Sequence, residues 1–151
     1  MYITSAGKVG IGTTSPANNL HIHTDAGDEG LLIKSTGNTS NAIIFDANRS
    51  GAGSSIGEIQ NKWNGTTVSM IASTTGSDTT NKDNGQLKFY TASAGSIAER
   101  MVIDDGGLVG IGTSGPIGNL HVASAGDGLV LSRSGYDTYS LCQFIYQQKE
   151  F

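Results

Sequence analysis

Short apolar segments run along the whole chain, separated by clusters of glycine, asparagine, aspartate and serine. In several of them apolar and polar residues alternate with a period of two, as in Leu87 and Phe89 against Lys88 and Tyr90. No window carries an apolar stripe at helical spacing over three turns. The pattern therefore predicts an all-β chain, with strands at residues 19–24, 30–35, 42–47, 55–63, 66–73, 85–92, 98–105 and 107–112.

The same pattern predicts where the chain reverses. Asn-Gly pairs at 64–65 and 84–85 indicate tight turns, because both residue types adopt positive φ at low cost. The polar run at 74–85 is expected to be an exposed loop.

One segment occurs twice, 100 positions apart: "VGIGTTSP" at 9–16 and "VGIGTSGP" at 109–116. Residues 1–22 and 101–122 are identical at 12 of 22 positions, and a weaker match continues between 26–37 and 125–135. A fixed period indicates an array in which each unit packs on its neighbours. We expect a first full unit at 1–100, made of the repeated element (1–22) and a β-rich module (23–100), and a second, incomplete unit at 101–151.

Within the repeated element, an extended "VGIGT" places Val9, Ile11 and Thr13 on one side and the two glycines on the other. The glycine side is bare backbone, so another chain or strand is expected to approach it closely. Pro16 then fixes a bend, which suits a chain that crosses between sheets.

Composition indicates an ordered chain with little core of its own. Glycine, serine, threonine and asparagine make up 64 of 151 residues, whereas leucine, isoleucine, valine and phenylalanine number 33. The net charge is only −4, so self-repulsion does not favour disorder. Chains this poor in core usually gain stability from disulfides, metals or partner chains. Cys142 is the single cysteine, so no disulfide forms within the chain and association with other chains is the expected remedy.

Several partners and site types are excluded. The nine lysines and arginines are scattered, so no nucleic-acid partner is expected. No apolar run approaches the length of a membrane span, so no membrane insertion is expected either. The "GIGTTS" segment lacks the third glycine of a dinucleotide fingerprint and the GK[ST] of a phosphate loop, and no helical pattern follows it.

His21 and His23 are the candidate metal ligands, because residues at i and i+2 share a strand face. Three copies about an axis would offer six imidazoles. However, the second copy keeps only His121, and Leu20 and Ile22 are expected to face inward, which turns both histidines to solvent. We therefore predict no metal site and no cofactor.

Trp63 is a candidate platform for a sugar ring, although a partly buried packing role is more usual for tryptophan. The acidic residues Asp46, Asp104–Asp105 and Asp28–Glu29 invite a glycosidase interpretation. Adjacent residues of a strand point to opposite sides, however, so neither pair aims two carboxylates at one bond. Asp104 and Asp105 precede two glycines and are better explained as turn residues. No catalytic residues are predicted.

The segments "ERMVIDDGGLVGIGTSGPIGNLHV" (99–122) and "MYITSAGKVGIGTTSPANNLHI" (1–22) resemble the element "ERMRI…GNVGIGTTSP…LHV". That element recurs in tail-fibre and tail-spike proteins of bacteriophages and in related fibrous proteins of bacteria. The resemblance covers about 46 residues in two copies. It implies an elongated repeat of short strands in an intertwined homotrimeric β-fibre, similar to a β-prism or triple β-helix, with apolar side chains inside.

The function implied by the resemblance is structural. The chain would form the shaft of a tail fibre on a virion, facing the extracellular medium, and would carry the parts that bind a host receptor. Its expected partners are two further copies, adjacent fibre segments or virion proteins, and a host surface glycan as a further candidate. The alternatives are a receptor- or glycan-binding adhesin module and a bacterial surface filament. Because Met1 aligns with the internal Met101, we expect the chain to be a segment of a longer fibre.

Overall fold

The computed structural model describes residues 1–25, 30–125 and 129, and this part of the chain contains strands and loops without a helix. The all-β prediction is confirmed there. The chain divides into two compact units, Met1–Ile44 and Phe45–Phe151. The second copy of the repeated element shares a sheet with the strands that precede it. The division of the chain at residue 100 stays a prediction.

The first unit contains one small sheet of three strands. Its strands are β1 (Tyr2–Ile3), β2 (Val9–Ile11) and β3 (Leu20–Ile22), in that order. β1 pairs with β2 antiparallel, and β2 pairs with β3 parallel.

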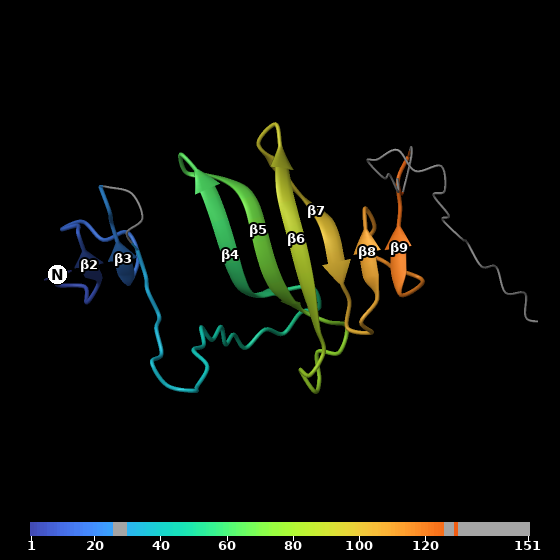
Figure 1. Ribbon diagram of the computed structural model, residues 1–151, viewed down its shortest axis with the longest axis horizontal. Helices are drawn as coiled ribbons and strands as arrows, with labels where there is room; N and C mark the ends of the chain where they lie inside the picture. Colours follow the sequence, from blue (N-terminus) through green and yellow to red (C-terminus); the bar gives the residue numbers. More distant parts are fainter. Residues whose placement is uncertain (26–29, 126–128, 130–151) are drawn as a thin grey trace, which may run out of the picture. The chain divides into compact units, whose positions relative to one another are not determined.

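The second unit contains a six-stranded sheet in sequence order (Figure 1). Four long strands form an antiparallel meander, β8 continues it antiparallel, and β9 pairs with β8 parallel. The strands are β4 (Ser55–Trp63), β5 (Thr66–Thr75), β6 (Gly85–Ser93), β7 (Ser96–Ile103), β8 (Val109–Ile111) and β9 (Leu120–Val122).

Two-residue turns close two of the hairpins. Asn64 and Gly65, both with positive φ, join β4 to β5 as predicted. Ala94 and Gly95 form an equivalent turn between β6 and β7 that the sequence analysis missed. The turn predicted at 84–85 is wrong, because Gly85 lies in the ladder opposite Thr75. The loop expected at 74–85 is therefore shorter and lies between β5 and β6.

Ala94→Asn is expected to stabilise the chain. Ala94 has a φ of 50°, a left-handed conformation that costs an L-residue about 1–2 kcal/mol and that asparagine tolerates better. We expect a gain of about 0.5–1 kcal/mol, measured as a higher urea midpoint at an unchanged m-value. Asn64→Ala in the matching hairpin should shift the midpoint in the opposite direction. An unchanged midpoint for Ala94→Asn would contradict this reading of the turn.

Two predicted strands are absent. Residues 30–35 and 42–47 have no strand assignment, and Leu31, Leu32, Ile43 and Ile44 are exposed. Their apolar, β-branched composition favours an extended chain, but a strand also needs a neighbour for its N–H and C=O groups. Neither segment takes part in a ladder of the two sheets.

Very little apolar surface is buried. Among the described residues the buried apolar side chains are Pro16, Ala72 and Val102, and Thr74 is the only buried polar side chain. Many large apolar side chains are exposed in both units. The expectation of a chain with little core of its own agrees with this burial.

Candidate functional site

The two copies of the repeated element have the same local geometry. In both, an antiparallel strand pair is followed by a parallel strand in the same register. The backbone N–H of Val9 donates to the carbonyl of Asn19 at 2.7 Å, and that of Val109 donates to Asn119 at 3.0 Å. The equivalent rows are Ile3, Val9 and Leu20 in the first copy and Ile103, Val109 and Leu120 in the second.

The glycines of the repeated element are approached closely, but by the chain's own backbone. Gly12 and Gly112 both have a φ of 72°, so the strand ends one residue earlier and "VGIGT" is not extended through Thr13. A Cβ on Gly12 would lie 2.1 Å from the carbonyl oxygen of His23, and one on Gly112 would lie 2.2 Å from that of Ala123. The expected close approach to these glycines is confirmed, and it is made by the chain's own backbone just after β3 and β9.

The proline-containing connection does not cross to another sheet. Residues 12–19 return the chain to the same sheet, where β3 lies parallel to β2. The loop is held locally: Oγ1 of Thr13 accepts a hydrogen bond from the N–H of Ser15, and Oγ1 of Thr113 accepts one from Gly115. The Thr13 carbonyl would lie 2.3 Å from a Cβ on Gly10, so the loop packs over this glycine.

The register of the six-stranded sheet gathers apolar side chains on one face, which we call the apolar face. Residues paired across a ladder point to the same side of a sheet. None of the residues in the two rows that form this face is buried, and none is ionisable. One row is Ile59, Ile71, Phe89, Met101, Ile111 and Val122, and the other is Gly57, Ser73, Leu87, Ile103, Val109 and Leu120.

The opposite face, which we call the loop face, is polar and partly covered. The connection between β8 and β9 lies over it, with the carbonyl of Thr113 2.5 Å from where a Cβ on Gly110 would be. Lys88 and Glu99, both largely buried, form an ion pair at 3.0 Å on this face. One row of the loop face alternates along the strands with the two apolar rows. It consists of Glu58, Ala72, Lys88, Val102, Gly110 and His121.

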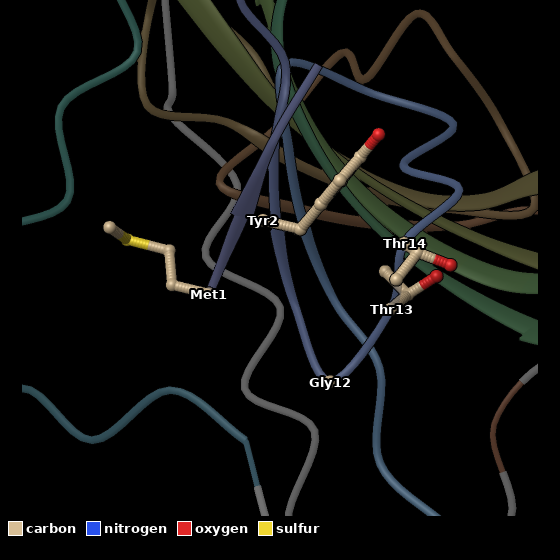
Figure 2. Close-up of a pocket in the computed structure, with 6 residues that line it drawn as sticks. Met1, Tyr2, Gly12, Thr13 and Thr14 are labelled. Carbon is tan, nitrogen blue, oxygen red and sulfur yellow. The ribbon is translucent and has the colours of Figure 1, made fainter.

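Open hollows lie beside the glycine turns. The first has a volume of about 530 Å³ and is lined by Met1, Tyr2, Gly10, Gly12, Thr13 and Thr14. Figure 2 shows that Met1 and Tyr2 point to opposite sides of β1, with Tyr2 on the side of Thr13 and Thr14. The hollow of the second copy, about 290 Å³, is lined by Glu99, Gly112, Thr113 and Ser114. The first lining offers hydroxyl and backbone groups but no lysine or arginine side chain, and among the described residues no helix begins there whose N-terminus could bind a phosphate.

The histidines lie elsewhere than expected. Leu20 is 54% exposed and lies on the same side of the three-stranded sheet as Ile3 and Val9. His21 therefore faces the other side, where its Nδ1 accepts a hydrogen bond from the N–H of Ala17 at 3.4 Å. The ring centroids of His21 and His23 are 6.0 Å apart, and Nε2 of His23 lies 3.2 Å from Asp25. Within the described ranges no three His, Cys, Asp or Glu side chains gather as a metal site would require.

Trp63 is 78% exposed, so the expected partly buried packing role is wrong. It lies at the end of β4, paired with Thr66 beside the two-residue turn. The tips of the β4–β5 and β6–β7 hairpins are at the same end of the sheet (Figure 1). A flat aromatic ring is thus presented to solvent on a short, well-defined turn.

The acidic pair at 104–105 forms turns, as predicted. Oδ1 of Asp104 accepts from the N–H groups of Gly106 and Leu108 at 3.0 and 2.8 Å. Hydrogen bonds from Asn84 first, and from Ser77, hold the pKa of Asp105 below its usual value. A general acid needs the opposite shift. Asp46 is exposed, and the Asp28–Glu29 pair and most of 125–135 lie outside the described residues.

No protein-family model matches the chain, and no curated protein is significantly similar to it. In the ranges that the structure describes, no helix has the length and apolar character to cross a membrane. The feature that sequence reasoning missed is the apolar face. Its signal was the alternation within each strand, but only the register shows that the strands align their apolar positions in shared rows.

Proposed function

We propose that this chain is a structural part of a homotrimeric bacteriophage tail fibre. It forms part of the shaft that carries the receptor-binding parts of the fibre. The observation that carries the proposal is the apolar face, which no described residue buries, although Phe45 packs against it at Gly57. The same pattern of apolar positions occurs in both copies of the repeated element. All six equivalent positions are apolar in each copy: Met1, Ile3, Val9, Ile11, Leu20 and Ile22, and Met101, Ile103, Val109, Ile111, Leu120 and Val122.

The energetics support association. Full burial of an aliphatic side chain contributes about 1.5–3 kcal/mol, but the described part of the chain buries only Pro16, Ala72 and Val102 among its apolar side chains. Packing against symmetry-related copies supplies the missing burial and leaves the repeat free to continue along an axis. The choice of three copies follows from the resemblance to tail fibres. On this proposal the chain lies on the virion, faces the medium and has no catalytic role.

The proposal is tested by the mass and shape of the purified chain in solution. Multi-angle light scattering should give a mass near three times the 15.6 kDa of the chain. Small-angle X-ray scattering should give the long, thin distance distribution of a rod. A compact particle with the mass of one chain would contradict the proposal.

A second candidate is glycan binding at Trp63, favoured by the exposure of this ring on a hairpin turn. Aromatic rings stack on the apolar faces of sugars. We expect Trp63→Ala to abolish binding on a glycan array, while Trp63→Tyr retains part of it, both without change in oligomeric mass. An intact wild-type oligomer that binds no glycan on the array would overturn this second candidate and leave the shaft function in place.

A further inference from the structure

We infer that the apolar face of the six-stranded sheet is the surface through which copies of this chain contact one another, centred on Ile71, Phe89 and Met101. The inference rests on the proposed homotrimer and names the surface that forms it. Ile71 pairs with Phe89 and Phe89 pairs with Met101, so the three lie in one row on adjacent strands. Ile59, Ile111 and Val122 continue this row to the edges of the sheet.

The size of the face is that of an interaction surface. Six strands about 4.8 Å apart span about 29 Å, and two rows of side chains extend about 13 Å along the strands, giving about 380 Å² in projection. Patches of about 300–600 Å² are the largest that monomers usually expose, and they are often functional. Side-chain relief enlarges the contact further, toward the about 800 Å² per partner of standard interfaces.

The two faces of the sheet differ in the free energy that a partner would have to spend on desolvating their side chains. The two apolar rows contain no ionisable group, so covering them desolvates no charge. The loop face carries Glu58, Lys88 and Glu99, and a partner there would have to match or desolvate these charges. The loop over Gly110 also prevents a flat approach to that face.

A polar row borders the apolar rows on the same face. Nδ2 of Asn61 donates to Oγ of Ser69 at 3.0 Å. Nε of Arg100, the extra residue at the irregularity between β6 and β7, donates to Oγ1 of Thr91 at 2.9 Å. These four residues are thus joined in two hydrogen-bonded pairs within the chain. They form a polar margin of the kind that surrounds the apolar centre of an interface.

The occupant we assign to the face is the same face of further copies. The first copy of the element presents the same apolar positions 100 residues earlier. A contact between copies therefore accounts for the apolar patch in each unit with a single kind of partner. An unrelated partner would have to recognise the same pattern in two separate units.

The test compares registered residue pairs on the two faces. Ile59→Lys/Ile71→Lys places two charges on the apolar face, and the control Gln60→Lys/Met70→Lys makes the same change in the neighbouring pair on the loop face. A milder variant, Ile59→Thr/Ile71→Thr, keeps β-branched side chains and guards against loss of folding. Mass is measured by light scattering over a concentration series, and strand content by far-UV circular dichroism.

We expect the lysine variant to fall to one third of the wild-type mass with its strand signal retained, and the control to keep the full mass. The threonine variant should dissociate at a protein concentration at least tenfold higher than the wild type. A folded lysine or threonine variant that dissociates no more readily than wild type, or a control that dissociates equally, would overturn the assignment of this face while leaving the trimer intact. A monomeric wild type would overturn both this inference and the proposed function.

Discussion

Gly112→Ala is expected to be the most damaging glycine-to-alanine substitution in the second copy of the repeated element. Alanine at a φ of 72° costs about 1–2 kcal/mol, and its Cβ would lie 2.2 Å from the carbonyl oxygen of Ala123. A backbone carbonyl cannot rotate away as a side chain can, so β9 must shift relative to β8. We expect a loss of about 3 kcal/mol or more and a fall in the thermal midpoint of more than about 10 °C.

The same loop provides a matched control. Gly115 has no atom within 4 Å of where a Cβ would be, and its φ is not in the left-handed region. Gly115→Ala should therefore be neutral or slightly stabilising, because alanine restricts the unfolded chain. Differential scanning fluorimetry of both variants makes the comparison. Equal midpoints for Gly112→Ala and Gly115→Ala would show that the close approach at Gly112 does not hold β9 in place.

Local signals in the sequence predicted local structure well. The short apolar segments predicted β4 to β8 of the larger sheet at least in part, though not β9, and Asn64–Gly65 predicted a hairpin turn, because both signals depend on neighbouring residues. Strand pairing depends on residues far apart. That is why 30–35, with the composition of a strand, was predicted wrongly.

At the candidate site, too, the sequence predicted the features that depend on neighbouring residues and missed those that depend on distant ones. Alternation placed Gly10 and Gly12 on a face of their own, but it carries no information on the sign of φ at Gly12, which ends the strand there. The turn role of Asp104 was predicted because its hydrogen-bond donors lie two and four residues away. The exposure of Trp63 depends on what the rest of the chain covers, and no local pattern encodes it.

Val102→Ala is expected to have the second-largest effect. Val102 is 0% exposed, and it lies in β7 between Lys88 on one side and Gly110 on the other. One of its methyl groups lies 3.1 Å from where a Cβ on Gly110 would be, beneath the connection that contains Thr113. Gly110 has no side chain to fill the space left by alanine. We expect a loss of about 2 kcal/mol.

Ile97→Ala in the same strand is the control, since it removes more atoms from a side chain that is 39% exposed. It should cost less than the change at Val102, because a large share of the lost surface already contacts water, whereas none of the Val102 side chain does. Urea unfolding at one fixed protein concentration separates these values from effects of association. A larger loss for Ile97→Ala than for Val102→Ala would mean that burial within the chain does not stabilise this sheet. A larger loss for Val102→Ala would show that the packing of the connection between β8 and β9 on β7 stabilises this sheet. That contribution comes from within one chain and does not need a partner chain on the apolar face.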